Sequence, residues 1–159
     1  MAAFERRRTD RAEMTLRTAC DSDVDVLLSL QREAFGEDPH CLTREGFEAF
    51  LIGGRTDVIA AERGGVVVGY AVLNNRPFRP WTALDYIAVK TSLRGGGIGE
   101  ALLAEAMTLA RRRTVRLFVR PTNRAAIRFY KRHGFDRSGI RANNYADGED
   151  AVIMTRRRP

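Results

Sequence analysis

The sequence predicts a single α/β domain built around one mixed sheet of about seven strands. Three observations support this: a strand followed by a glycine-rich loop and a helix, a second strand–helix unit after it, and hairpin signals on both sides. The expected order of elements is β-α-α-β-β-β-α-β-α-β-β. A chain of 159 residues is long enough for one hydrophobic core, and no internal repeat or boundary interrupts it.

The first elements follow a segment with no capacity to pack. Residues 1–13 are charged and poor in apolar side chains, so we expect a flexible tail before a domain that spans residues 14–159. A strand is predicted over residues 15–19. An apolar stripe from Val24 to Phe35 then predicts a helix, which Asp21–Ser22 should cap.

A second helix and a hairpin complete the N-terminal half. Thr43 should cap the helix, which ends at Gly53–Gly54. Strands are expected over residues 57–62 and 66–73. The intervening Arg63–Gly64–Gly65 is typical of a hairpin turn.

The centre of the chain reads as strand, glycine loop and helix. After a loop at residues 77–80, residues 84–89 are short, apolar and β-branched, as in a buried strand. Residues 94–99 are too rich in glycine for a regular element. The apolar residues that recur with helical spacing after this loop are Ile98, Ala101, Leu102, Ala106 and Leu109. Unpaired N–H groups at such a helix start, free of obstructing side chains, form a site for a phosphate.

The last third repeats this pattern and closes with a hairpin. A strand is predicted over residues 115–119 and a helix over residues 123–133, ending at Gly134. Residues 140–145 and 151–155 are expected to pair as antiparallel strands.

The glycine loop matches only one of three phosphate-binding patterns. A Walker loop needs Lys-Ser or Lys-Thr after its glycines, where this chain has Gly99–Glu100. The spacing of the dinucleotide fingerprint is also absent. Arg94, Gly97 and Gly99 instead follow the pattern arginine, two residues, glycine, one residue, glycine, which resembles the acyl-coenzyme A pyrophosphate loop of the GNAT N-acetyltransferase superfamily. A turn without a ligand is the alternative.

A second segment strengthens this resemblance. Asn123, Ala126, Tyr130 and the pair Gly134–Phe135 are similar to the later signature of the same superfamily. The resemblance extends over residues 15–155. It implies a mostly antiparallel sheet with helices on both faces, and an enzyme that transfers an acetyl group from acetyl-CoA to a primary amine by direct attack in a ternary complex.

The resemblance also implies where the cosubstrate binds. Backbone N–H groups of the glycine loop would hold its pyrophosphate, and the pantetheine arm would lie along the end of the central strand. Asn123 would touch that arm, although it could equally serve only as a helix cap. The implied cofactor-binding residues are Ile87, Ala88, Val89, Arg94, Gly95, Gly96, Gly97, Ile98, Gly99, Asn123, Ala126 and Tyr130.

Two side chains are candidates for catalysis. Tyr130 lies about two helical turns after Asn123 and is the candidate general acid for the departing thiolate, unless it only packs beside Ile127. Asp85 interrupts an apolar strand and should share a face with Ile87 and Val89 because side chains alternate. Burial would raise its pKa into a range useful for a base. The alternative is an ion pair with a nearby arginine, such as Arg79 or Arg120.

The acceptor site is implied by a closer resemblance. Residues 143–154 and a loop with Phe35 and Pro39 are similar to the protein N-terminal acetyltransferases, including those of ribosomal-protein alanine. The implied acceptor-binding residues are Phe35, Pro39, Asp85 and Tyr145. The sequence departs from the ribosomal-protein enzymes at Phe118, where they carry a catalytic glutamate, and at His40, where they carry an aromatic residue.

Three functions therefore stay open. A protein or peptide N-terminal α-amine is the favoured acceptor. A small amine such as a polyamine, an amino acid or an aminoglycoside is the second, which an acidic cleft around Glu37, Asp38 and Asp85 would favour. The third is an acyl-coenzyme A binding domain without catalysis.

Composition narrows the partners. The net charge of +7 comes mainly from three arginine runs, Arg6–Arg8, Arg111–Arg113 and Arg156–Arg158. Without aromatic residues between them, these predict a coenzyme rather than nucleic acid as the anionic partner. Cys20, Cys41 and two histidines show no metal-ligand spacing. No apolar run suits a membrane span or a secretory signal, so we expect a cytoplasmic protein. We also expect it to be a monomer or a homodimer.

Overall fold

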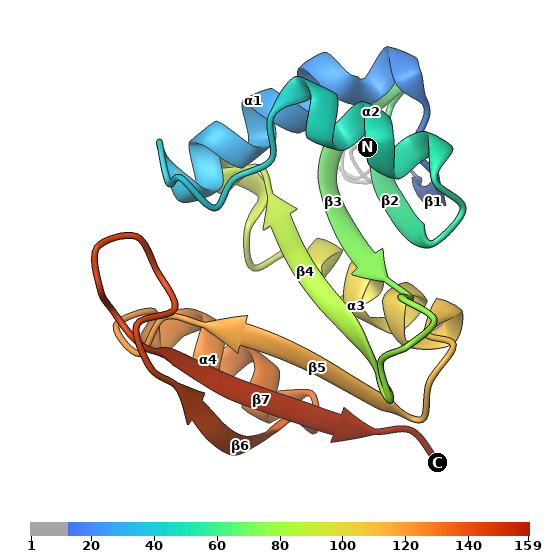
Figure 1. Cartoon of the computed structure of the whole chain (residues 1–159). Helices are drawn as coiled ribbons and strands as arrows, with labels where there is room; N and C mark the ends of the chain where they lie inside the picture. The colour runs from blue at the N-terminus through green and yellow to red at the C-terminus, as the bar shows by residue number, and fades with distance from the viewer. Residues whose placement is uncertain (1–12) are drawn as a thin grey trace, which may run out of the picture.

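A seven-stranded sheet runs through the described residues in the order β1-β2-β3-β4-β5-β7-β6 (Figure 1). The computed structural model describes residues 13–159, so all of the predicted tail except Glu13 lies outside the described residues. The strands are β1 (Met14–Thr18), β2 (Thr56–Arg63), β3 (Val66–Asn74), β4 (Trp81–Val89), β5 (Thr114–Val119), β6 (Asp136–Arg141) and β7 (Ala151–Arg157). The helices are α1 (Val24–Phe35), α2 (Arg44–Ile52), α3 (Ile98–Leu109) and α4 (Arg124–Arg132), with short 3₁₀ turns η1 (Asp21–Asp23) and η2 (Thr91–Leu93).

The sheet is mixed and mostly antiparallel, as predicted. Every neighbouring pair of strands is antiparallel except β4 and β5. The predicted order of helices and strands is also confirmed. No helix within residues 13–159 is long and apolar enough to cross a bilayer.

Helices cover both faces of the sheet, and each face has its own core. Ile98, Leu102 and Leu103 of α3 pack with Phe135 on one face. On the other face α1 and α2 bury Leu27 and Phe47 against β3. Complete burial of an aromatic side chain such as Phe47 stabilises a fold by roughly 1.5–3 kcal/mol. The buried side chains of both cores together hold the helices against the sheet.

Local signals define most element boundaries. Thr43 caps α2 by accepting a hydrogen bond from the Gly46 N–H at 3.1 Å. Asn123 caps α4 through its side-chain oxygen, which accepts from the Ala126 N–H at 3.1 Å. Gly134 follows α4 with a φ of +81°, a conformation that favours glycine. These three predictions are confirmed.

The cap of α1 differs from the prediction. Neither Asp21 nor Ser22 caps the helix, because both lie in the turn η1 that precedes it. Asp23 organises the turn instead: its carboxylate accepts from the Cys20 N–H at 2.8 Å and from the Arg17 guanidinium at 2.7 Å. The hydrogen bond from Arg17 is the main reason that the pKa of Asp23 is lowered to about 2.

The closing hairpin was predicted with the wrong first strand. The expected strand over residues 140–145 is found at Asp136–Arg141, where it pairs with β7. β6 is an edge strand and is mostly exposed, so it lacks the apolar alternation that would mark its position in the sequence. Residues 142–150 form a loop, in which Asn143 has a φ of +49° and donates its N–H to Asp150.

Candidate active site

The site lies where β4 separates from β5. Only three residue pairs join these strands, Trp81 with Thr114, Thr82 with Val115 and Ala83 with Arg116. Beyond them the strands diverge (Figure 1), and a cavity of about 680 Å³ opens in the gap. This is a typical volume for a small-molecule site. The sequence did not show that β4 separates from β5. This separation leaves the space that the predicted position of a pantetheine arm requires.

The glycine loop forms one end of the cavity. Gly95 and Gly97 have φ values of +79° and +89°, and a Cβ atom added to either would meet no protein atom within 4 Å. Gly97 precedes α3 as its N-cap residue. The Glu33 carboxylate accepts from the Thr91 N–H at 2.6 Å and so holds η2 against α1. The N-terminus of α3 is therefore surrounded by open space, as an anion site requires.

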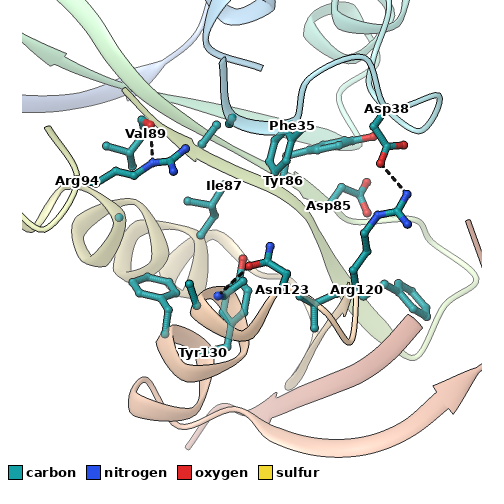
Figure 2. Close-up of a pocket in the computed structure, with 18 of the residues that line it drawn as sticks. Phe35, Asp38, Asp85, Tyr86, Ile87, Val89, Arg94, Arg120, Asn123 and Tyr130 are labelled. Atoms are coloured by element: carbon teal, nitrogen blue, oxygen red, sulfur yellow. Dashed lines mark hydrogen bonds and ion pairs between the residues drawn. The ribbon is translucent and has the colours of Figure 1, made fainter. Parts of the chain in front are cut away.

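Residues of α4 form one wall of the cavity. Figure 2 shows Asn123 and Tyr130 across from Ile87 and Asp85 of β4. The Tyr130 ring makes edge contacts with Phe129 and Phe135, with centroids 5.3 and 5.6 Å apart. Burial raises the pKa of the Tyr130 phenol above its usual range. The hydroxyl group therefore stays protonated at neutral pH.

Asp85 occupies a β-bulge. Val72 pairs with Tyr86 and Leu73 pairs with Leu84, so Asp85 is the extra residue of β4. The predicted alternation fails here, because Leu84 and Ile87, three residues apart, both pack into the core beneath α3. Asp85 nevertheless lines the same cavity as Ile87 and Val89. The bulge, and not regular alternation along the strand, turns its side chain toward that cavity.

The Asp85 carboxylate accepts one hydrogen bond, from the Asn74 amide at 3.3 Å. Within residues 13–159 it forms no ion pair with Arg79 or Arg120, so the predicted alternative role is not observed. Its side chain is exposed to the cavity, with protein on the remaining sides close enough to desolvate it in part. This desolvation raises its pKa, against the Asn74 hydrogen bond and the charges of Arg76 and Arg79.

The opposite end of the cavity is organised by four charged residues, which we call the Arg120 cluster: Arg120, Asp38, Asp147 and Glu149. The guanidinium donates to Asp38 at 2.8 Å, to Asp147 at 2.9 Å and to Glu149 at 2.7 Å. It also lies 3.8 Å from the centroid of the Tyr145 ring. One side chain thus joins the α1–α2 loop (residues 36–43) to the β6–β7 loop (residues 142–150).

The Arg120 cluster carries an excess of negative charge, three carboxylates against one guanidinium. Burial alone would raise the pKa of Asp38, but hydrogen bonds from the His40 N–H and Arg120 lower it. Hydrogen bonds also lower the pKa values of Asp147, chiefly from the Glu149 N–H, and of Glu149, chiefly from Arg120. The carboxylates are therefore ionised at neutral pH. Their contribution to stability is fully present above about pH 5 and is lost as the pH falls through the lowered values.

His40 adds a second connection between the two loops. Its ring nitrogen Nε2 lies 3.0 Å from the Asn144 carbonyl, and its ring meets the Tyr145 ring edge-on at 5.1 Å. The Tyr86 hydroxyl donates to the His40 carbonyl from below. The sequence reasoning considered His40, Asp38 and Arg120 separately but did not predict their contacts, because the partners are distant in the chain. The polar or charged character of residues 37–40 and 147–150 was the only signal.

Comparison with known proteins identifies the family. The family model described as "Acetyltransferase (GNAT) family" matches residues 24–135, which include β4, the glycine loop and α4. The chain belongs to the GNAT family. Its predicted identity as an N-acetyltransferase of this family is thus confirmed.

Relatives of this GNAT enzyme include N-terminal acetyltransferases. It is 32% identical over 151 residues to the N-alpha-acetyltransferase RimI of Mycobacterium tuberculosis, a match that covers 92% of this chain and 94% of the relative. It is 31% identical to an uncharacterised protein of Mycobacterium leprae, of which it spans only 42%. The crystal structure of the ribosomal-protein-S18-alanine N-acetyltransferase from Escherichia coli superposes with a TM-score of 0.76 at 26% identity, covering 91% of this chain and 94% of that one.

The GNAT signature residues mostly converge on the cavity. The predicted site residues that line it are Phe35, Asp85, Ile87, Ala88, Val89, Arg94, Gly95, Ile98, Gly99, Asn123, Ala126, Tyr130 and Tyr145. Gly96, Gly97 and Pro39 lie in the adjoining loops without lining it. Asp38, His40, Phe118 and Arg120 line it as well, and of these Arg120 was considered only as a partner for Asp85.

Removing the Arg120 guanidinium should loosen the end of the cavity at which the Arg120 cluster lies. In Arg120→Ala the two loops lose three hydrogen bonds and the carboxylates are left to repel one another. We expect the KM for the acceptor to rise by about 5- to 20-fold, corresponding to roughly 1–2 kcal/mol. The dissociation constant of coenzyme A, measured by calorimetry, should change less than about twofold because the glycine loop is untouched.

Arg137→Ala is the matched control, since Arg137 is exposed on β6 away from the cavity. It should leave both constants unchanged. An equal loss of coenzyme and acceptor affinity in Arg120→Ala would contradict a role confined to the two loops that Arg120 joins.

Proposed function

We propose that this enzyme transfers the acetyl group of acetyl-CoA to the α-amine of a protein or peptide N-terminus. One observation carries the proposal: a single cavity runs from the glycine loop to the Arg120 cluster, with Asp85 and Tyr130 between them (Figure 2). The anionic carrier and the cationic acceptor would thus enter at ends of opposite electrostatic character. The names of the relatives from Mycobacterium tuberculosis and Escherichia coli support the same acceptor class.

The cosubstrate fits the glycine-loop end of the cavity. The open N–H groups around Gly97 would bind its pyrophosphate. The backbone of residues 85–89 has no pairing with β5, so its polar groups are available to the pantetheine amides, as an edge strand is to an added strand. Asn123 keeps its role as a cap and would contact the arm from α4.

Between its ammonium form and the amide product the nitrogen must lose two protons, and the departing thiolate must gain one. Asp85 accepts a proton from the ammonium, directly or through a water, and the free amine attacks the thioester carbonyl carbon. The tetrahedral intermediate collapses with cleavage of the C–S bond, and Tyr130 donates its proton to the departing thiolate. The amine nitrogen then loses its second proton to the Tyr130 phenolate through solvent, which leaves the neutral amide and restores the phenol. The pKa values of both side chains are raised, so Asp85 is a stronger base and Tyr130 a weaker acid than usual.

The energy of deprotonation favours an α-amine over a lysine. At pH 7, removing a proton costs about 1 kcal/mol for an α-amine of pKa about 7.8 and nearly 5 kcal/mol for a lysine of pKa about 10.4. Phe118 stands where ribosomal-protein enzymes are expected to carry a glutamate, and Asp85, which lines the same cavity, would replace that glutamate as the base. A site with one base of modest strength suits the acceptor that is easier to deprotonate.

A small polycation is the second candidate acceptor. The negative excess of the Arg120 cluster, with Glu37 exposed beside it, would also attract a polyamine or an aminoglycoside. The loops that frame the cluster are drawn together by His40 and Arg120, which favours the narrow end of a peptide over a bulky cyclic amine.

The deciding experiment compares peptides that each carry one lysine and either a free or an acetyl-blocked α-amine. Thiol release from acetyl-CoA is measured, with a polyamine and an aminoglycoside as further acceptors. We expect turnover on the free terminus and at least about 100-fold less on the blocked peptide, as the difference in deprotonation energy requires. Turnover that survives blocking would refute the α-amine, and turnover confined to small amines would establish the second candidate.

Substituting the proposed base should have an effect that depends on pH. We expect Asp85→Asn to lower kcat/KM about 10-fold at pH 7 with an α-amine acceptor, since removing that proton costs only about 1 kcal/mol. The deficit should shrink toward pH 9, where the free amine dominates. The melting temperature should be unchanged or higher at pH 7, because a carboxyl group with a raised folded pKa costs stability once it ionises.

Asn74→Ala is the control for Asp85→Asn, as it removes the hydrogen bond but keeps the carboxylate. Its kcat/KM should stay within about threefold of the native value. A pH profile of Asp85→Asn parallel to that of the native enzyme would exclude Asp85 as the base.

A further inference from the structure

Two arginine runs that acetyl transfer does not use meet at one end of the fold. Arg111–Arg113 form the turn between α3 and β5, and Arg156–Arg158 end β7. The Arg158 N–H donates to the Arg113 carbonyl at 2.6 Å, and Thr114 pairs with Arg157 across the strands. The fold therefore brings both runs into one cluster.

Two further segments extend this cluster. The Arg112 guanidinium donates to the Pro77 carbonyl at 2.6 Å, which draws in the β3–β4 loop (residues 75–80) with Arg76 and Arg79. The Arg111 guanidinium donates to the Gly54 carbonyl at 3.3 Å, next to Arg55. We call residues 53–55, 76–82, 110–116 and 155–159 the basic end.

The basic end is strongly and almost uniformly positive. Its four segments contain ten arginines and no aspartate or glutamate. Asp57 lies beside it but is hydrogen-bonded to the Asn75 amide at 2.8 Å. In Figure 1 the β3–β4 loop, the α3–β5 turn and the C-terminus lie together, on the opposite side from the diverging ends of β4 and β5. The charge is thus separated from the acetyl-transfer cavity.

Two aromatic side chains, Phe78 and Trp81, alternate with Arg76 and Arg79 in the chain, and the fold places them beside the two arginine runs. The Phe78 side chain is 97% exposed, an extreme value for a large apolar residue. The Trp81 ring has the Arg116 guanidinium 3.8 Å from its centroid and that of Arg79 at 5.9 Å. Arginine binds phosphates through a planar fork, and exposed aromatic rings stack on unpaired bases.

We propose that the basic end binds single-stranded nucleic acid. Its arginines contact the phosphates, and Phe78 stacks on a base. A single strand is favoured over a duplex because the end is built from loops and strand termini, with no helix placed to enter a groove, and because Phe78 needs an unstacked base. This inference does not depend on the acceptor or the chemistry proposed for the cavity.

The test is fluorescence polarisation with a labelled 20-nucleotide RNA of mixed sequence at several salt concentrations. The native protein should bind with a dissociation constant of roughly 1–100 µM near physiological salt and with a log–log salt slope of about −2 or steeper. The emission of Trp81, the one tryptophan in the chain, should change on binding. A native protein without measurable affinity, or an unchanged emission, would overturn the proposal.

Charge reversal at exposed positions distinguishes the effect of the basic end on RNA affinity from the effect of the overall net charge. Arg55, Arg113 and Arg157 are exposed, and their side chains form no hydrogen bond with any residue in the range 13–159. The variant R55E/R113E/R157E should bind RNA at least about 30-fold more weakly, with a slope lower by about 2, since each phosphate contact contributes about 0.7. Its melting temperature and its acetylation of a short peptide should match those of the native enzyme.

The matched control is R32E/R128E/R137E, which makes the same change in net charge at exposed positions elsewhere. It should retain affinity within about threefold, and an equal loss in both variants would overturn the proposal. Phe78→Ala should weaken binding about fivefold or more without changing the slope. Single-stranded DNA bound as tightly as RNA supports the proposal; duplex RNA or polyglutamate bound as tightly as single strands refutes it.

Discussion

Replacing Tyr130 by phenylalanine is expected to lower kcat by about 10²- to 10⁴-fold, the usual contribution of a general acid. The phenyl ring preserves the edge contacts with Phe129 and Phe135, so the wall of the cavity keeps its shape. Only the hydroxyl group that we propose as the proton donor is lost. The dissociation constant of acetyl-CoA, measured by calorimetry, should stay within about twofold, and thiol release under saturating substrates measures kcat.

The raised pKa of Tyr130 adds an expectation about when the proton is transferred and over which pH range. A phenol whose pKa is raised by burial is a weak donor to a free thiolate, whose conjugate acid has a pKa of about 8.5. Proton transfer should therefore accompany C–S cleavage rather than precede it. Ionisation of Tyr130 should not limit kcat below about pH 10.

Tyr145→Phe is the matched control for Tyr130→Phe, since Tyr145 also lines the cavity and its ring contacts with Arg120 and His40 survive the change. Its kcat should fall less than about threefold. If Tyr130→Phe retained native kcat, the thiolate would have to be protonated by another group or by solvent.

The second large effect is expected at Gly99, in the first turn of α3. An aspartate here would place a carboxylate beside the proposed pyrophosphate site. Two like charges about 5 Å apart repel by about 3 kcal/mol at an effective dielectric constant of 20. We expect the affinity for coenzyme A, measured by calorimetry, to fall about 100-fold in Gly99→Asp. The fold should tolerate the change, because a negative charge in the first turn of a helix is favourable.

Two further substitutions at Gly99 separate charge from shape. A Cβ atom at this position would lie 3.5 Å from the Phe129 ring and 3.9 Å from Val89, which is ordinary contact. Gly99→Ala should therefore cost about threefold or less, and the uncharged Gly99→Asn about 10-fold. Equal affinities for Gly99→Asp and Gly99→Asn would show that no phosphate charge lies near this turn.

Local chemistry explains which parts of the fold were predictable. The caps at Thr43 and Asn123 and the glycine that ends α4 depend on neighbours within four residues, so the chain order reveals them. β6 was misplaced because an exposed edge strand needs no apolar pattern. The turn around Asp23 was missed because Arg17, on another element, decides which carboxylate is held.

The candidate site also combines residues that the local sequence reveals with residues that only the fold brings together. Arg94, Gly97, Gly99 and Tyr130 lie in short motifs whose spacing is visible in the sequence. The bulge at Asp85 arises from the register between β3 and β4, and no local pattern marks it. Arg120 meets Asp38 from 82 residues away, a contact that only the folded sheet creates.

The short contact between β4 and β5 has a kinetic consequence. Three residue pairs are all that connect these strands, so the backbone beyond Ala83 lacks its partner until the arm of the carrier takes that place. An acceptor that bound first would find this side of its binding site incomplete. We therefore expect an obligatory order of addition, with the thioester before the amine, and peptide binding that calorimetry detects only once coenzyme A is present.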